Sequence, residues 1–217
     1  MRDQWFGDNK DLIKWGVLLE LARRYDVEHI PQVLYLTETT WEGLEIDDVL
    51  VELPTEVVKH FRDATSVSQM QCAAHIEVFS KPFADRNEYH QELLEQIQSR
   101  PKRPGIIFLD PDTGLQPAGA AGLKHVLDSE LTKIWQVLCP SDILVFYQHQ
   151  TNRNSTLWVD SKKAQFERAL GVQEGSAKLA HAPGIARDVA FFFIEKKGEQ
   201  GDGPKPERRS THPKSAA

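Results

Sequence analysis

Short apolar segments alternate with longer segments of helical periodicity along most of the chain. Apolar runs with the length and composition of β-strands occur at residues 33–36, 48–53, 76–79, 106–109 and 142–147. Apolar residues recur at helical spacing over residues 9–25, 55–61, 87–98, 129–138 and 161–170, the last of which ends at Gly171. Strands that alternate with helices predict a mostly parallel sheet with helices on both faces.

The pattern changes after residue 171. Apolar segments at residues 177–181 and 188–194 are separated only by a turn at Pro183-Gly184, which favours an antiparallel hairpin. We therefore expect a Rossmann-like three-layer α/β sandwich, a mostly parallel sheet with a C-terminal antiparallel hairpin, as a single domain over residues 1–197. Residues 198–217 hold too little apolar surface to offset the entropy of ordering, and we expect them to form a disordered tail.

Composition narrows the class of protein only slightly. The 217 residues are 40% hydrophobic and 27% charged, as in an ordinary globular chain. No run approaches the roughly 18 apolar residues of a membrane span, and the first residues lack the apolar core of a signal peptide, so we expect a cytoplasmic protein without membrane contact. Cys72 and Cys139 are isolated, which supports neither a disulfide framework nor a cysteine zinc site. A net charge of −6 disfavours tight duplex binding and leaves a nucleotide-sized ligand open.

The most informative chemistry follows the strand at residues 106–109. Asp110 and Asp112 come directly after it, in the sequence Asp-Pro-Asp-Thr-Gly that ends at Gly114. In open α/β sheets ligands bind outside the carboxyl ends of the strands, so both carboxylates are candidate catalytic groups. The same residues also suit a plain turn, in which aspartate caps its own backbone and glycine supplies a positive φ.

A second polar cluster, Tyr147-Gln148-His149, ends the strand expected to be the neighbour. We expect His149 to share the crevice with Asp110 and to act as a general base or a metal ligand, with Tyr147 or Gln148 in contact with substrate. The alternative is a histidine that only satisfies a backbone carbonyl.

Glu38 and Trp41 both follow the first strand and belong to the same edge of the sheet. Glu38 could bind a ribose hydroxyl or complete a metal site, or it could be an exposed loop acid. Trp41 is a candidate substrate contact at the mouth of the site, whereas the other tryptophans are better explained as packing residues.

The first helix opens with three charged residues of interest. Asp11 and Lys14 share one helix face, where they could form an ordinary ion pair, and Asp8 could be a plain N-cap. The functional alternative, that they face the crevice of Asp110, depends on a family likeness.

The α/β alternation closed by a hairpin resembles the class I S-adenosylmethionine-dependent methyltransferase fold. The segment that begins at Gly7, Gly-Asp-Asn-Lys-Asp-Leu-Ile-Lys, is similar to the Gly-x-x-x-Asp-x-x-Lys helix opening of the bacterial 23S rRNA adenine-N6 methyltransferase family. In that family the segment lies over the cofactor and substrate pocket. The whole chain also looks like a bacterial family of similar length with Asp-Pro-Asp-Asn/Thr-Gly and Tyr-Gln-His strand ends.

The resemblance implies S-adenosylmethionine as the cofactor, held by Gly7, Asp8, Asp11, Lys14 and Glu38. It also places Asp110 where the relatives have the aspartate of an Asp-Pro-Pro-Tyr motif, which holds the target amine. The chain departs from this pattern twice. Asp112-Thr113 replace the proline and the aromatic residue that stacks on the base, and no glycine-rich turn follows the strand at residues 33–36.

Three classes of function follow. The first is a methyltransferase acting on a nucleic-acid base or a nucleotide-like amine, with Asp110 positioning the substrate. The second is a phosphoryl-transfer or nuclease-like enzyme that uses Mg²⁺ or Mn²⁺ bound by Glu38, Asp110 and Asp112, because carboxylates are the ligands these ions prefer. The third is a non-catalytic binding domain on the same scaffold.

Overall fold

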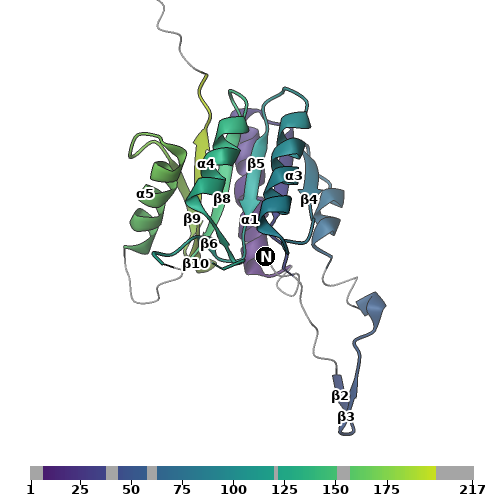
Figure 1. Ribbon diagram of the computed structural model, residues 1–217. Coiled ribbons are helices and arrows are strands. Elements are labelled where there is room, and N and C mark those ends of the chain that lie inside the picture. The colour runs from purple at the N-terminus through teal and green to yellow at the C-terminus, as the bar shows by residue number, and fades with distance from the viewer. Residues whose placement is uncertain (1–6, 38–43, 58–62, 120–121, 151–156, 199–217) are drawn as a thin grey trace, which may run out of the picture.

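The centre of the protein is a six-stranded, mostly parallel sheet (Figure 1). The structure is a computed structural model, and it describes residues 7–37, 44–57, 63–119, 122–150 and 157–198. The sheet has the order β4-β1-β5-β8-β10-β9. Its strands are β1 (His29–Leu34), β4 (His75–Phe79), β5 (Ile106–Asp110), β8 (Ile143–His149), β9 (Lys178–Ala182) and β10 (Ala186–Glu195).

Strand direction decides which residues meet at each edge of the sheet. β1 pairs in parallel with both β4 and β5, and β5 pairs in parallel with β8. β10 is antiparallel to β8 and to β9, so the predicted C-terminal hairpin is confirmed. The carboxyl ends of β5 and β8 therefore lie at the same edge as the amino end of β10.

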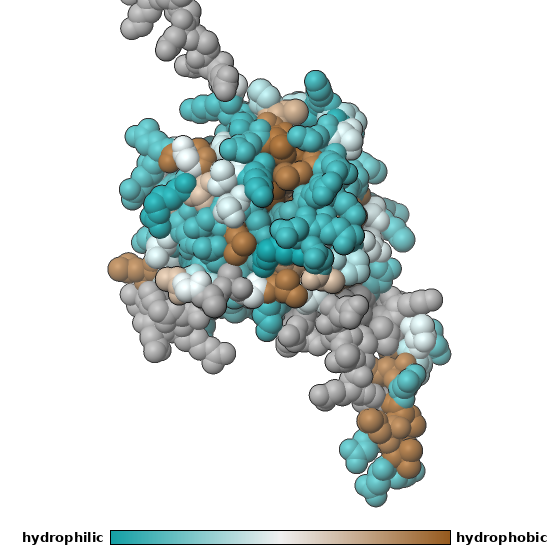
Figure 2. Space-filling view, viewed as in Figure 1, coloured by the Kyte–Doolittle hydropathy of each residue, from teal (hydrophilic) through white to brown (hydrophobic). Residues whose placement is uncertain are grey.

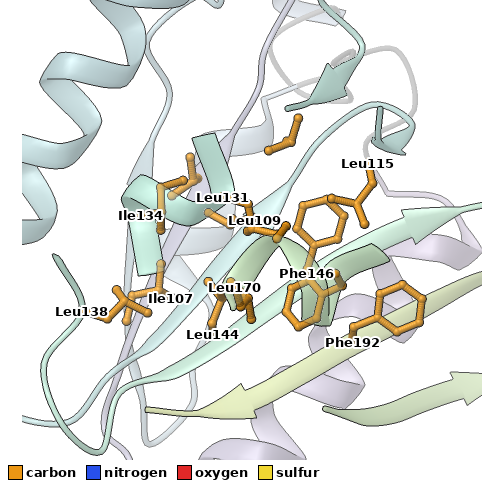
Figure 3. Close-up of a cluster of buried hydrophobic side chains, with 14 of the residues drawn as sticks. Ile107, Leu109, Leu115, Leu131, Ile134, Leu138, Leu144, Phe146, Leu170 and Phe192 are labelled. Atoms are coloured by element: carbon orange, nitrogen blue, oxygen red, sulfur yellow. The ribbon is translucent and has the colours of Figure 1, made fainter. Parts of the chain in front are cut away.

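Helices cover both faces of the sheet, as the alternation of strands and helices predicts. α1 (Asn9–Tyr25) and the short 3-10 helix η2 (Ala64–Gln69) pack on one face. α3 (Arg86–Ser99), α4 (Asp128–Val137) and α5 (Trp158–Leu170) pack on the other, and Figure 1 shows them in front of the sheet with α1 behind it. Alternate residues of each strand feed the two cores, because successive side chains of a strand point to opposite faces. Figure 3 shows the core beneath α4 and α5, to which β5, β8 and β10 contribute Ile107, Leu109, Leu144, Phe146 and Phe192.

Local signals set the ends of the helices. The Asp8 carboxylate accepts hydrogen bonds from the backbone N–H groups of Lys10 and Asp11, which confirms an N-cap at the start of α1. α5 ends at Gly171, whose φ of 67° is the left-handed conformation that favours glycine.

The strand expected at residues 48–53 is wrong as part of the central sheet. Residues 49–51 form β3 (Val49–Val51), which pairs only with β2 (Leu44–Ile46) in a separate two-stranded hairpin. Asp47 and Asp48 both have positive φ, as a two-residue hairpin turn requires. The side chains of residues 45–51 are exposed, reaching 72% at Leu50, and Figure 2 shows the apolar residues of the hairpin gathered in an arm away from the main body. An apolar, β-branched run does not by itself reveal whether anything covers it.

Two further points concern the remaining segments. A second small parallel pair, β6 (Gly114–Leu115) and β7 (His125–Val126), follows the β5 strand end. Of the helix expected at residues 55–61, residues 55–57 are helical and the rest lie outside the described residues, as does the expected tail after residue 198.

None of the helices in the described parts of the chain is long and apolar enough to cross a membrane.

Candidate functional site

Asp110 and His149 lie at the same edge of the sheet. Leu109 is the register partner of Phe146, so Asp110 lies beside Tyr147 and two residues before the level of His149. A strand separation of about 4.8 Å and a rise of about 3.3 Å per residue put the two Cα atoms roughly 8 Å apart. The prediction that the two strand ends share one edge is confirmed.

A buried ammonium group connects α1 to the end of β5. Lys14 Nζ lies 3.0 Å from Asp110 Oδ2 and 3.0 Å from Asp11 Oδ1. It also lies 4.8 Å from the centre of the Tyr147 ring. Lys14, Asp11 and Asp110 are all buried, so the prediction that Asp11 and Lys14 face Asp110 is confirmed. The ordinary alternative, an ion pair on the solvent face of the helix, is wrong.

Asp110 itself is completely buried, and only part of its hydrogen-bonding capacity is used. Its Oδ2 accepts hydrogen bonds from Lys14 Nζ and, at 3.1 Å, from Gln32 Nε2. Its Oδ1 is 3.0 Å from Lys14 Nζ as an ion pair, but it accepts no hydrogen bond from the described residues. Gln32 Oε1 is likewise a buried acceptor without a hydrogen bond. Most buried polar groups have a hydrogen-bond partner, so two adjacent exceptions need an explanation.

The charges of this cluster do not cancel. Two carboxylates, Asp11 and Asp110, surround one ammonium. Burial raises the pKa of Asp110, and Lys14 offsets this only in part. Burial opposes the charge of Lys14 as well, but the carboxylates of Asp110 and Asp11 outweigh that effect and raise the pKa of Lys14. Both changes favour retention of a proton, as expected for a buried group of net negative charge.

The loop after β5 is a rigid turn supported by Gln148. The Gln148 side chain accepts a hydrogen bond from Leu115 N at 2.9 Å and donates to Thr113 O at 3.3 Å and His149 O at 2.8 Å. Gly114 has a φ of +123°, and a Cβ there would clash with the Gln148 amide. Gln148 was predicted to contact substrate. It is instead fully buried in the support of this turn, because it points to the face opposite Tyr147 and His149.

Tyr147 lies under α1, where it packs against Lys14 and Phe191. Burial, followed by the nearby carboxylate of Asp110, raises the pKa of Tyr147 strongly. Its phenol therefore stays neutral at physiological pH, and it lies beside the ion pair.

His149 belongs to a second, more accessible cluster. Its Nε2 lies 2.9 Å from Lys10 Nζ and 2.8 Å from Asp188 Oδ2, and Lys10 Nζ lies 3.1 Å from the same Asp188 oxygen. Burial opposes the charge of Asp188, but Lys10 and His149 outweigh it and lower the pKa of Asp188. Lys10 is one helical turn before Lys14, so α1 supplies one cation to each cluster.

Two cavities border the first turn of α1. One, of about 660 Å³, is lined by Gly7, Asp8 and Asp11 together with apolar side chains of α1 and η2. The other, of about 1080 Å³, is lined by Asp8, Lys10, Gln150, Arg187 and Asp188. Within the first, Gly7 N donates to Asp11 Oδ2 at 2.6 Å. Asp110 lines neither cavity.

The remaining predicted site residues contribute less to this geometry. Asp112 is half-buried and makes no hydrogen bond or ion pair with the described residues. Glu38 and Trp41 lie outside the described residues. The described segments contain no group of three or more His, Cys, Asp or Glu side chains placed to hold a metal ion.

No family model and no curated protein sequence matches this chain.

Sequence reasoning missed four residues that the structure brings to this edge: Lys10, Gln32, Arg187 and Asp188. The sequence contains signals that could have identified two of these residues, Gln32 and Lys10. Gln32 is a polar residue directly before the apolar run at residues 33–36, and Lys10 precedes Lys14 by one helical turn. Asp188 is the third residue of the return strand β10, and the antiparallel pairing of β10 with β8 brings it next to His149.

Proposed function

We propose that the protein is a Rossmann-like methyltransferase acting on an amine of a nucleic-acid base or another nucleotide-like substrate. The observation that carries this proposal is the pair of buried acceptors without hydrogen bonds at the end of β5, Asp110 Oδ1 and Gln32 Oε1. A primary amine brings two N–H donors, which is the complement that two neighbouring acceptors need. Asp110 is also the residue that the family likeness assigns to the target amine.

The contact between Lys14 and Asp110 supports the same proposal. The likeness assigns the helix opening and the strand end to a single pocket, and in this chain they touch at 3.0 Å. Replacement of a buried ion pair by apolar side chains is often neutral or stabilising, so stability alone does not explain why the pair is retained. Perturbed pKa values in a cluster near a cavity are typical of functional sites.

The residues around the 660 Å³ cavity fit S-adenosylmethionine in part. Gly7, Asp8 and Asp11 would hold it, because the carboxylates of Asp8 and Asp11 suit a cation. Trp15 and Leu12 supply an apolar wall for the adenine. When bound, the cofactor would supply the methyl group.

The end of β1 fits the methionine part of the cofactor less well. Tyr35 is fully buried against Phe83 and Tyr89, and Leu36 O accepts a hydrogen bond from Phe83 N. Residues 35–37 thus pack on protein and contain no glycine that would let a ligand approach the backbone closely. The proposal therefore places the cofactor beside α1 and not over this turn.

The test is ligand-dependent stability with S-adenosylhomocysteine and S-adenosylmethionine, with MgCl₂ and MnCl₂ run in parallel. A ligand that binds only the folded state at 100 times its Kd adds about 2.7 kcal/mol, which is on the order of 5–10 °C for a domain of this size. Asp110→Asn should remove methyl transfer to ribosomal RNA or nucleotide acceptors and leave S-adenosylhomocysteine binding nearly intact. Asp112→Asn should change both much less. Stabilisation by the metal ions alone would refute the proposal and support the phosphoryl-transfer alternative.

A non-catalytic binding domain is the second candidate, and the complete burial of Asp110 favours it. A carboxylate that is completely buried and lines neither of the two cavities beside α1 must be uncovered before it can hold a substrate. Binding of nucleotide ligands with no methyl transfer in the wild-type protein, and no effect of Asp110→Asn on that binding, would decide for this candidate.

A further inference from the structure

The larger cavity lies where the amino end of β10 meets the first turn of α1. It has a volume of about 1080 Å³, and its lining combines the cations Lys10 and Arg187 with the anions Asp8 and Asp188. Three of these four groups are already engaged. Asp8 caps α1, and Lys10 pairs with Asp188. Arg187 is exposed and makes no ion pair or hydrogen bond with the rest of the described chain.

His149 contacts two residues that line this cavity, Lys10 and Asp188, and it is held in a defined tautomer. Its Nδ1 lies 3.0 Å from the backbone carbonyl oxygen of Gln150. A carbonyl oxygen can only accept a hydrogen bond, so Nδ1 carries the hydrogen and Nε2 is the nitrogen whose protonation sets the charge of the ring.

The two neighbours of Nε2 require opposite protonation states. Neutral His149 accepts a hydrogen bond from Lys10, at 2.9 Å, whereas the imidazolium donates to Asp188, at 2.8 Å. Asp188 is held anionic by Lys10 and His149, which lower its pKa. A proton that arrives at Nε2 replaces the hydrogen bond from Lys10, and Asp188 is already within hydrogen-bond distance to accept the new N–H. Such an arrangement suits a group that accepts a proton from a ligand.

We infer that this cavity binds the acceptor substrate as a phosphate-bearing nucleotide, with Arg187 on the phosphate and His149 Nε2 accepting a proton from the substrate nitrogen. This inference rests on the proposed function, which sets the direction of the proton transfer from substrate to His149. It adds the chemical class of the substrate. A guanidinium pairs with phosphate through two parallel hydrogen bonds, and Arg187 is the unengaged cation of the described lining.

The proton balance is simple. A neutral amine nitrogen would form its bond to the methyl carbon as the carbon–sulfur bond of the sulfonium donor breaks, with the electron pair of that bond left on the sulfur of the departing thioether. The nitrogen would then be positively charged and carry one proton too many. That proton passes to His149 Nε2, the N–H bond electrons stay on the substrate nitrogen, and the resulting imidazolium pairs with Asp188. Release of the proton to water returns His149 to the form that accepts from Lys10.

The experiment compares AMP with adenosine as probes, by calorimetry and by the ¹⁵N NMR signal of the His149 ring, without any methyl donor. We expect AMP to bind at least tenfold more tightly than adenosine and to shift the Nε2 signal more than the Nδ1 signal. Arg187→Gln should bring the two affinities together. Arg168→Gln, which changes an exposed arginine on α5, is the matched control and should leave the preference for AMP unchanged.

His149→Gln tests the second half of the inference. It should leave the Arg187-dependent preference for AMP in place, and any methyl transfer should fall at least a hundredfold and depend less on pH. Thermal unfolding of each variant checks that the fold is retained, which is expected because His149 and Arg187 are not core residues.

Three outcomes would overturn the inference: no binding of AMP, equal binding of AMP and adenosine, or equal effects of Arg187→Gln and Arg168→Gln. S-adenosylhomocysteine binding is measured separately on the same variants. If the nucleotide preference holds and S-adenosylhomocysteine does not bind, the methyltransferase proposal fails, and with it the direction of proton transfer, while the nucleotide site stands. If S-adenosylhomocysteine binds and AMP does not, the cavity assignment fails and the proposed function stands.

Discussion

Lys14→Met should destabilise the fold far more than an ordinary loss of a lysine. The variant keeps a side chain of similar length but removes the cation that lies between Asp11 and Asp110. At an effective dielectric constant of about 20, each contact at 3.0 Å is worth roughly 5 kcal/mol before desolvation is subtracted. Removal of one partner of a buried pair typically costs about 3–5 kcal/mol, because the other charge stays buried without compensation.

The loss should also depend on pH in a defined direction. Burial already raises the pKa of Asp110, and removal of Lys14 raises it further. A carboxyl whose pKa is higher in the folded state than in the unfolded state stabilises the fold at low pH. This stabilisation is lost as pH rises through the pKa of the folded state. The difference in unfolding free energy between wild type and Lys14→Met should therefore be smaller at pH 5.5 than at pH 8.

Urea unfolding followed by circular dichroism measures both effects. Lys10→Met is the matched control, since it removes a half-exposed lysine one turn away on the same helix and should cost at most about 1 kcal/mol. The double variant Lys14→Met/Asp110→Asn should lose less than Lys14→Met alone, because the uncompensated charge is gone. A loss below about 1 kcal/mol for Lys14→Met, or the same loss at both pH values, would refute the reasoning.

Three further predictions concern the rest of the fold. Burial lowers the pKa of His29, so neutral His29 contributes fully to the stability of the fold above about pH 6.5, and this contribution is lost as pH falls toward the pKa of the folded state. In His29→Gln, the unfolding free energy should therefore decline less steeply as pH falls below about 6.5. Gly114→Ala should cost about 2 kcal/mol or more in chemical denaturation, because φ is +123° and Gln148 fills the space, whereas Gly184→Ala should stay within about 0.5 kcal/mol. Leu50→Ser should leave the melting temperature within about 2 °C of wild type, since that side chain is 72% exposed.

Elements whose apolar face enters a core could be predicted from sequence. The strands β4, β5 and β8 and the helices α3, α4 and α5 lie within a few residues of their predicted bounds, because the period of apolar residues reports which side is covered. The hairpin of residues 44–51 shows the limit of this argument. Its apolar residues have the composition of a core strand, and only the pair of positive-φ residues at Asp47-Asp48 marks a tight turn.

The candidate site also has features that could be predicted from the sequence and features that could not. The shared edge of Asp110 and His149 follows from parallel strands, so it could be predicted. The burial of Asp110 could not be predicted from the sequence, because it depends on how α1 packs across the sheet. The opposite orientations of Tyr147 and Gln148 follow from strand alternation, but only once the covered face of β8 is known.

The spacing of Lys10 and Lys14 explains how one helix can serve both clusters. Residues four apart lie on the same helix face, so once Lys14 is fixed between Asp11 and Asp110, the position of Lys10 follows. Lys10 then lies 2.9 Å from His149, in the half-exposed cluster that borders the larger cavity. The buried cluster has the poorer access, whereas the outer cluster is more accessible and has a nitrogen whose proton can move. We therefore expect substitutions at Lys14 to act mainly through the position of α1, and those at His149 to act on the chemistry itself.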